Sequence, residues 1–517
     1  MVSMKSLKDL QKTVNQGLAL IKQDEDLIEG VVYASSNHRT VGRICYTRHI
    51  PSNGLQEPKS DEDFGVSVEI WFEKSGKKLL GFGQEPNDLS ANAIKRAFEK
   101  AKRDAVEDPD FTGFSKKEEF LKKYQVKQGY HDRKLMSMDY KKEARLLAEM
   151  SWNTIRGAID ALAAMNHEPS TMSFILSGDN FLIRERMCVG STNGIFDTDE
   201  TTVVLSFLTA MIEDKNAKGS AWKASAKLNA KDPYNVGKET TKAAIKQIGG
   251  TRVKTGKYTV IFGPQAVTEL FGLLLNHLNL SMIDFGASIY LGKYGQLIAS
   301  PLLNLYDDAT LKGGAGTKRI TCEGKPTERT DLIKNGKLVG YLSDTKIRNK
   351  MLAKKDESRT KIGADPNKIP DAIAPKNGYR FSRGGGRIAS SGVGISATNL
   401  VIDSSKPILN NQLLKTVGNG LYIGRLWYTY PVGGYSSGII SGTAIADNFV
   451  IKDGKFDRSI LPNTLRLEDN IGEMMKNIIA IGRDRVQTIL WASDEITHAP
   501  LVAIKNVNLK EISKSIY

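Results

Sequence analysis

The stretch "GLYIGRLWYTYPVGGYSSGIISGTAIADNFVIKDGK", Gly420–Lys455, decides the fold of the second half of the chain. It is rich in glycine, β-branched and aromatic residues, a composition typical of strands joined by tight turns. The pattern therefore predicts several antiparallel strands. From about residue 250 onward, strand and turn signals dominate, apart from an opening helix and a second one near "LEDNIGEMMKNIIAIG". We expect a β-rich, largely antiparallel domain there.

The first 230 residues mix helical and strand patterns. "GVSVEIWFEKSGKKLLGFG", Gly65–Gly83, alternates apolar and polar residues around a turn at Lys74–Lys77, so it predicts a β-hairpin. The following helix has Asp88 or Ser90 as its N-cap. A chain of 517 residues is long enough for two or more domains. We predict an α+β protein with an N-terminal α/β domain at residues 1–235 and a β-rich C-terminal domain at residues 236–517.

Composition and charge narrow the class of protein. The chain has 40% hydrophobic and 25% charged residues, and no apolar run reaches the ~18 residues that a membrane helix needs. The N-terminal segment predicts an amphipathic helix, not a secretory signal. Three widely spaced cysteines, Cys45, Cys188 and Cys322, suit a reducing compartment, so we expect a cytoplasmic protein without membrane contact. The net charge is +15, but the lysines are interspersed with acids, so nucleic-acid binding is not expected.

An ordered set of segments resembles the TldD/PmbA family, whose PmbA-type members are also called TldE. The segments are "TGKYTVIFGPQAVTELFGLLLNHL", "SIYLGKYGQLIASPLLNLYDDATL", "CEGKPTERTDLIKNGKLVGYLSD", the stretch Gly420–Lys455 and "THAPLVAIKNVNL". The resemblance implies a cytoplasmic subunit of a metallopeptidase complex that processes peptides. TldD carries zinc on an H-E-x-x-x-H helix with a cysteine near the C-terminus, and TldE/PmbA is its zinc-free partner.

The segment "TELFGLLLNHLNLSMIDFG", Thr268–Gly286, stands where the resemblance places the zinc helix. Glu269 and His277 are eight residues apart, a rise of about 12 Å in a helix, which is too far for two ligands of one zinc ion. The TldD ligand positions fall near Phe271 and Asn276, and no cysteine follows Cys322. We therefore expect a core helix, no metal and no catalytic residue in this chain, and closest similarity to the zinc-free TldE/PmbA type.

Other constellations leave alternatives open. Cys322 is a candidate nucleophile only if a histidine base lies nearby, and Asp307-Asp308 is a candidate cation site; structural turns are the commoner explanation for both. "RGGGR", Arg383–Arg387, could cradle an anion through its amides. It lacks the strand-to-helix context and the lysine of a P-loop, so a flexible loop is the favoured interpretation. The polar, proline- and glycine-punctuated stretch 353–392 predicts a long surface loop.

The predicted role is that of a non-catalytic subunit. It pairs with a TldD-like subunit that carries the zinc, or with a second copy of itself, and it helps to hold a peptide substrate added as a strand to a sheet edge. Trp427, Tyr428, Tyr430 and Tyr435 are the candidate peptide contacts; sheet packing is the alternative for them. Two other functions stay open: a stand-alone peptide hydrolase or modifying enzyme with a non-zinc site at Cys322 or Asp307-Asp308, and a nucleic-acid-linked scaffold such as a gyrase modulator.

Overall fold

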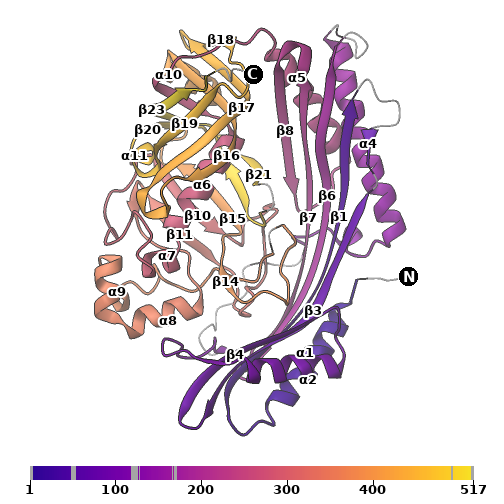
Figure 1. The fold of residues 1–517 in the computed structure, drawn as a ribbon, viewed down its shortest axis with the longest axis vertical. Helices are drawn as coiled ribbons and strands as arrows, with labels where there is room; N and C mark the ends of the chain where they lie inside the picture. The colour runs from indigo at the N-terminus through magenta and orange to yellow at the C-terminus, as the bar shows by residue number, and fades with distance from the viewer. Residues whose placement is uncertain are drawn as a thin grey trace.

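The computed structural model describes residues 4–47, 54–56, 58–117, 126, 129–165, 167, 172–382, 384–490 and 493–513. They form an α+β protein, as predicted. A long antiparallel sheet runs along one side of the molecule, and the C-terminal region packs against it (Figure 1). The sheet order is β5-β4-β3-β1-β6-β7-β8, with β2 paired to β1. The strands are β1 (Leu27–Thr47), β2 (Gly54–Leu55), β3 (Lys59–Lys74), β4 (Lys77–Pro86), β5 (Val106–Glu107), β6 (Phe174–Ser191), β7 (Phe196–Ile212) and β8 (Ala217–Ser225).

The predicted hairpin is the β3–β4 pair. Lys74 pairs with Lys77, and the two residues between them, Ser75 and Gly76, have φ values of 53° and 74°. Positive φ at both central residues is the type I′ geometry, whose twist matches that of the flanking strands. The hairpin register places Val68 and Ile70 in the core.

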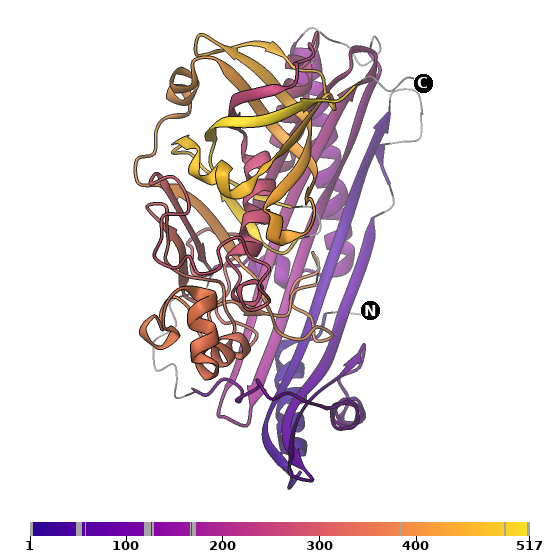
Figure 2. The ribbon, with the colours of Figure 1, turned by 60° about the vertical axis from the view of Figure 1, so that its left-hand side comes forward.

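Helices cover one face of this sheet (Figure 2). They are α1 (Leu7–Ile21), α2 (Ala91–Arg103), the short α3 (Arg133–Met136), α4 (Tyr140–Ala164) and α5 (Asp232–Lys246). Helix α1 is the predicted amphipathic helix of the N-terminal segment, and Leu10, Val14, Leu18 and Ile21 on one of its faces are buried. Ser90 caps α2, as one of the two predicted alternatives. The predicted boundary between residues 235 and 236 falls inside α5, which packs on α4 and β8; the boundary stays a prediction.

The opposite face of the sheet meets the C-terminal region. Successive residues of a strand point to opposite faces, and in the centre of β1 the even-numbered side chains contact helices, as His38 does with Glu143 of α4. The odd-numbered ones contact the C-terminal region: the Tyr33 hydroxyl lies 3.7 Å from Cys322 Sγ, and Asn37 Nδ2 donates to the Arg387 carbonyl at 2.8 Å.

The C-terminal region contains a small closed barrel. Its sheet runs β16-β9-β23-β19-β17, and β16 also pairs with β17, which closes the ring. These strands are β9 (Gly256–Phe262), β16 (Gly420–Pro431), β17 (Ile439–Lys452), β19 (Leu465–Asn470) and β23 (Val502–Glu511); β18 (Lys455–Ser459) and β20 (Ile478–Ile481) pair at its edges. The predicted strands of Gly420–Lys455 are thus β16, β17 and the start of β18.

A second sheet has the order β12-β11-β10-β15-β22-β21, and a two-stranded ribbon pairs β13 with β14. Most C-terminal pairs are antiparallel, as predicted; β9–β16 and β15–β22 are parallel. The strands are β10 (Leu303–Asp308), β11 (Arg329–Lys334), β12 (Lys337–Leu338), β13 (Gly378–Tyr379), β14 (Gly394–Ile395), β15 (Asn399–Ser404), β21 (Val486–Ile489) and β22 (Ile496–Ala499). The helices are α6 (Pro264–His277), α7 (Leu280–Asp284), α8 (Thr345–Ala353), α9 (Lys355–Ile362), α10 (Asn410–Val417) and α11 (Ile471–Lys476).

The prediction of a long surface loop at 353–392 is wrong for much of the stretch. It begins with α9, and its second half lies between the two regions, where Arg380 and Arg387 are among the most buried large side chains of the described chain. Arg380 pairs with Glu69 and Arg387 with Glu185. A buried charge needs such a partner, and both partners come from the N-terminal sheet.

Helices α1 to α11, as far as the structure describes them, include no span long and apolar enough to cross a membrane.

Candidate functional site in the cleft between the two regions

Helix α6 occupies the position expected for a zinc helix, and its residues do not fit zinc. Phe271 is fully buried in the C-terminal core. Asn276 donates its side-chain amide to the Gly272 carbonyl one turn back, at 3.3 Å. Within the described ranges, no three His, Cys, Asp or Glu side chains gather closely enough to hold a metal ion. The helix is a core element.

Glu269 and His277, the two ionisable residues of α6, lie in separate surroundings. His277 is buried, its ring standing edge-on to Tyr290 and Tyr435 at centroid distances of 6.2 and 6.3 Å, and burial lowers its pKa to about 4. Glu269 lies near Thr429 and Arg425 of β16, and burial raises its pKa to about 7. Glu269 therefore faces the barrel strand that leads into the cleft.

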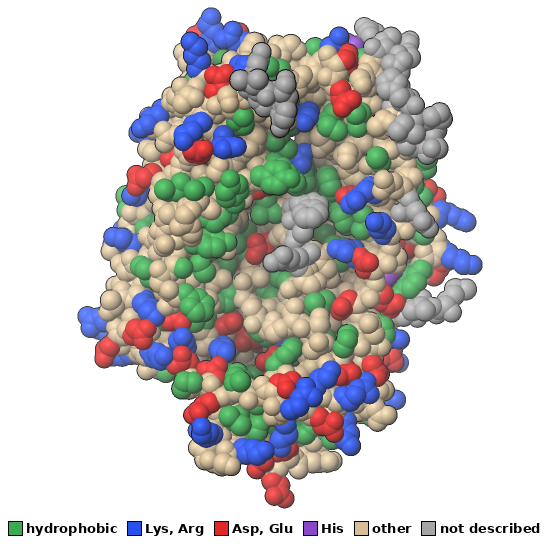
Figure 3. All heavy atoms as spheres, viewed as in Figure 1, with side chains coloured by type: hydrophobic (Ala, Val, Ile, Leu, Met, Phe, Trp, Pro, Cys, Tyr) green, Lys and Arg blue, Asp and Glu red, His purple; other side chains and the backbone are tan. Residues whose placement is uncertain are grey.

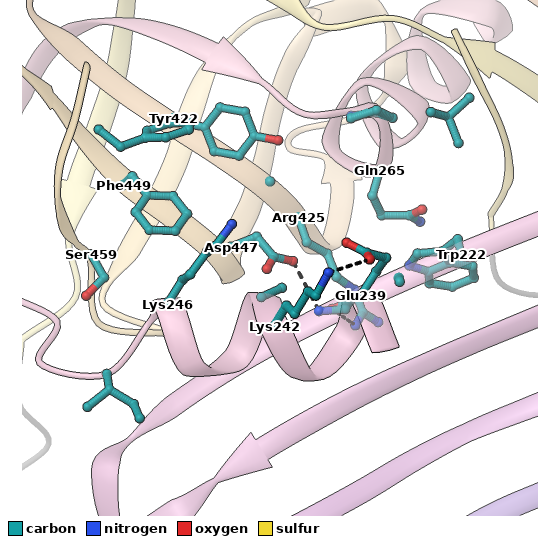
Figure 4. Close-up of a pocket in the computed structure, with 18 of the residues that line it drawn as sticks. Trp222, Glu239, Lys242, Lys246, Gln265, Tyr422, Arg425, Asp447, Phe449 and Ser459 are labelled. Carbon is teal, nitrogen blue, oxygen red and sulfur yellow. Dashed lines mark hydrogen bonds and ion pairs between the residues drawn. The ribbon is translucent and has the colours of Figure 1, made fainter. Parts of the chain in front are cut away.

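The N-terminal end of α6 opens on a cavity of about 820 Å³ between the two regions. Its walls come from β8 and α5 on the N-terminal side and from β16, β17 and α6 on the other (Figure 4). Polar and aromatic side chains alternate around it, among them Trp222, Lys242, Lys246, Gln265, Tyr422, Arg425, Asp447 and Phe449. A volume of this size suits a drug-sized ligand or a short stretch of peptide.

Arg425 lies at the centre of this cavity, with only 7% of its surface exposed. One terminal guanidinium nitrogen donates to Thr209 Oγ1 at 2.7 Å and to Ser220 Oγ at 2.9 Å, both on the N-terminal sheet. The guanidinium lies 5.4 Å from the ring centroids of both Trp222 and Trp427. Arg425 thus links the barrel to the long sheet through hydrogen bonds and cation–π contacts.

Asp447 on β17 is the acidic counterpart of Arg425. Its carboxylate accepts from the Ser220 amide at 3.2 Å, and burial raises its pKa to about 7 although Arg425 and Lys246 act in the opposite direction. Asp447 therefore holds its proton more tightly than an exposed aspartate does.

A second cavity of about 370 Å³ continues the cleft along the inner face of the long sheet. Trp222 lines both cavities, and Phe207 stacks on it with a centroid distance of 4.5 Å. Leu205, Ile489 and Leu490 complete its apolar wall. Hydrophobic side chains gather in the hollow between the C-terminal region and the sheet in Figure 3. The cleft as a whole combines an apolar floor with one charged end.

The four aromatic residues predicted as peptide contacts are not all in one place. Trp427 is half-buried beside Arg425, so it lies next to the cleft. Tyr428, Tyr430 and Tyr435 are 75%, 51% and 39% exposed on the surface around the β16–β17 turn. Tyr428 has a φ of 50°, where a break in the β16–β17 ladder turns the strand. Peptide contact by these residues stays a prediction.

Two residues of the cavity, Arg425 and Gln265, were not predicted from the sequence. For Arg425, the available signal was a charged residue between apolar neighbours in "YIGRLW". It was not usable alone, because the partners of Arg425, Thr209 and Ser220, lie more than 200 residues away in the chain.

Cys322 and Asp307, from the two alternative sites, make hydrogen bonds in the protein interior. Cys322 is fully buried; burial raises the pKa of its thiol, and its sulfur contacts the Tyr33 hydroxyl and the Arg380 amide. Asp307, also fully buried, accepts from the Thr398 amide and hydroxyl, the Asn399 amide and the Asn377 side chain. These contacts hold loops together.

The "RGGGR" segment does cradle an anion, and the anion is internal. The amides of Gly384 and Gly386 donate to the two carboxylate oxygens of Asp494 at 2.9 and 2.7 Å. Arg383 lies outside the described residues.

The stability contributed by Glu269 is expected to depend on pH. Its pKa is about 7 in the folded chain and 4.5 ordinarily, so the folded state holds the proton more tightly, and stability falls as pH rises from about 4.5 to about 7. Glu269→Gln is therefore expected to gain stability relative to the parent across this window, by an amount on the order of a few kcal/mol. Urea unfolding at pH 5 and pH 8 measures the difference. Glu473→Gln, an exposed acid on α11, is the control; an equal response of both variants would contradict the assignment.

Comparisons with known proteins agree on one family. Residues 255–511 match the PmbA/TldA metallopeptidase C-terminal domain. A metalloprotease of Methanothermobacter thermautotrophicus is 24% identical over 305 residues, covering 57% of this chain and 59% of the relative. Metalloprotease PmbA of Escherichia coli O157:H7 is 23% identical over 255 residues, covering 49% and 47%. The chain thus spans about half the length of the curated relatives it matches.

The fold is similar to that of TldE from Thermococcus kodakarensis, with a TM-score of 0.74 at 16% identity, covering 97% of this chain and all of that one. The two findings converge, because the matched domain contains the barrel and α6, and the solved structure extends the likeness to the long sheet. Residues 255–511 are therefore similar to the metallopeptidase C-terminal domain of the PmbA/TldA family, and the described chain as a whole shares the fold of a solved TldE.

Proposed function

We propose that this chain is a TldE/PmbA-type subunit without a zinc centre of its own, which pairs with a zinc-carrying TldD-like subunit and helps to hold a peptide for hydrolysis. The observation that carries the proposal is the composition of α6. Phe271 and Asn276 stand near the expected ligand positions, the first in the core and the second bonded to its own helix. In this proposal the partner subunit supplies the metal, and this chain supplies the cleft beside α6.

An unpaired edge of β16 supports the peptide-holding role. Strand β9 pairs with β16 only through Leu421–Ile423, so within the described chain residues 424–431 have no ladder partner on that side. Main-chain groups at such an edge accept an added strand. The same segment carries Arg425 into the cleft and Trp427 beside it, so an added peptide would run past both.

An exposed apolar surface supports pairing with another subunit. Tyr428, Tyr430, Val432, Tyr435 and Ile439, here called the β16–β17 patch, are 39–75% exposed and close together in the chain. A lasting interface between homologous subunits buries more than about 2,000 Å² and is apolar at its centre. We propose that this patch contributes to the interface with a TldD-like subunit, and that it supports a self-pair when the chain is produced alone.

The experiment is to purify the chain alone, and together with a TldD-like protein from the same host. We expect the chain alone to contain no stoichiometric zinc by elemental analysis and to leave unfolded peptides intact. The pair is expected to elute as one complex, with zinc and with peptidase activity that exceeds that of either protein alone.

A matched pair of variants tests the patch. Tyr430→Glu is expected to abolish co-elution, whereas Trp152→Glu, a similarly exposed aromatic on α4, is expected to leave it intact. About one zinc per chain, or peptide hydrolysis by the chain alone, would overturn the proposal and favour a stand-alone enzyme.

A further inference from the structure

The large cavity ends at helix donors that have no partner within their own helix. Helix α6 begins at Gly263, whose amide donates to the Ile423 carbonyl at 2.8 Å, and no side chain caps it. Pro264 has no N–H, and Val267 donates to the Gly263 carbonyl at 2.9 Å. The amides of Gln265 and Ala266 are therefore the first-turn donors left over. Such donors, at the positive end of the helix dipole, favour an anion.

Two buried polar side chains at the same place each have one atom without a hydrogen-bond partner. Gln265 and Arg425 are each 7% exposed, and neither Gln265 Oε1 nor Arg425 Nε makes a hydrogen bond within the described chain. Both line the cavity, and Figure 4 shows the Gln265 amide pointing into it toward the Arg425 and Trp222 side chains. Rotation of the Gln265 amide presents its NH₂ group as a donor. An unsatisfied buried guanidinium nitrogen costs free energy that a bound acceptor would recover.

The charges around the cavity fit a single negative charge. Lys242 is paired with Glu239 at 3.2 Å, and Arg458 lies 3.8 Å from Asp457. Arg425, Lys246 and Asp447 remain, a net charge of about one positive unit when Asp447 is ionised. A carboxylate, a monoanion, matches this balance better than a phosphate dianion.

The wall beside these groups is aromatic. Tyr422, Phe449 and Phe456 form a cluster with centroid distances of 4.8–6.3 Å, and all three line the cavity. An apolar side chain adjacent to the carboxylate would bury its surface there, at about 25 cal/mol per Å².

We propose that this cavity binds the C-terminal carboxylate of a peptide, with Arg425, Gln265 and the first-turn amides of α6 as the anion-binding groups and Tyr422, Phe449 and Phe456 as the pocket for the last side chain. The inference rests on the proposed peptide-holding function and specifies its substrate class. Peptides with a free, apolar C-terminal residue are the ligands, and a peptide extending from it along the cleft would pass the free edge of β16.

The test uses the full chain, purified without a partner or zinc, and isothermal titration with one unstructured pentapeptide ending in leucine. The same peptide with a C-terminal amide is expected to bind at least ~10-fold more weakly, since each tenfold change in Kd corresponds to about 1.4 kcal/mol. Arg425→Gln is expected to weaken binding of the acid to the level of the amide and to leave amide binding unchanged. Lys246→Gln is expected to weaken acid binding by a smaller factor. Because Lys246 is exposed, this variant is expected to fold, so it tests the site even if the Arg425 variant misfolds.

Arg483→Gln is the control, because Arg483 is an exposed arginine that does not line the cavity. Equal affinity for acid and amide, absence of binding by both, or displacement of the acid by inorganic phosphate at lower concentration than by acetate would each overturn the proposal. The outcomes separate from those of the proposed function, because binding is measured without hydrolysis. If the chain prefers the acid to the amide but a partner gives no peptidase activity, the carboxylate site is supported and the subunit role is refuted. If a partner gives peptidase activity but the chain does not distinguish acid from amide, the subunit role is supported and the carboxylate site is refuted.

Discussion

Arg387→Met is expected to lower the free energy of unfolding by about 3–5 kcal/mol, the largest effect of any single charge deletion proposed here. Arg387 is fully buried. Its Nε donates to Glu185 Oε1 at 2.9 Å, and a terminal nitrogen donates to Asp199 Oδ2 at 2.8 Å. Methionine fills similar volume but leaves both carboxylates buried with fewer cationic partners. Lys318, 2.9 Å from Glu185, compensates only one of them.

The position of Arg387 extends the effect beyond one contact. Glu185 and Asp199 belong to the N-terminal sheet, whereas Arg387 and Lys318 belong to the C-terminal region. Loss of the arginine therefore weakens the packing of the two regions against each other. Chemical denaturation followed by circular dichroism measures the change. Arg103→Met, which removes an exposed ion pair with Asp104, is the control and is expected to cost less than about 1 kcal/mol. A similarly small change for Arg387→Met would show that the ion pairs of Arg387 with Glu185 and Asp199 are not required for stability.

Phe271→Ala is expected to destabilise the protein by about 3–5 kcal/mol, because it removes a fully buried aromatic ring and leaves a cavity in the C-terminal core. Phe271 belongs to the same cluster as Leu270 and Leu274. Were α6 a surface helix that presented its side chains to a bound metal, truncation there would change stability little.

Phe285→Ala is the matched control, since Phe285 follows α7 and is 79% exposed. Its truncation is expected to change the free energy of unfolding by less than about 0.5 kcal/mol. Urea unfolding of both variants at one pH gives the comparison. Equal effects of the two substitutions would contradict the assignment of α6 to the core.

Local patterns in the sequence were sufficient for several elements. The β3–β4 hairpin follows from residues within twenty positions of one another: alternating side chains and a two-residue turn that accepts positive φ. Helix α1 follows from the amphipathic pattern of the N-terminal segment. The barrel strands β16 and β17 follow from the composition of Gly420–Lys455. The burial of α6 follows from its apolar residues, among them Phe271, Leu274 and Leu275.

The stretch 353–392 shows where local reasoning ends. Its proline, glycine and charged residues are those of a surface loop, yet Arg380 and Arg387 are buried. Both arginines are buried because they pair with the carboxylates of Glu69, Glu185 and Asp199, which lie 188 to 311 residues away in the chain. Burial of an arginine depends on its partner, and sequence spacing does not reveal which acid will be adjacent.

The sequence by itself determined the β3–β4 hairpin, helix α1, the β-rich character of the second half and the helical, apolar nature of α6, since each depends on residue types at short separation. Only the tertiary structure decided that the barrel closes through the β16–β17 pair, that Arg425 donates across the cleft to Thr209 and Ser220, and that the α6 N-terminus opens on a cavity walled by both regions. The physical reason is that side-chain alternation and helical periodicity are local, whereas hydrogen bonds, ion pairs and cavities arise between groups that only the folded chain brings together.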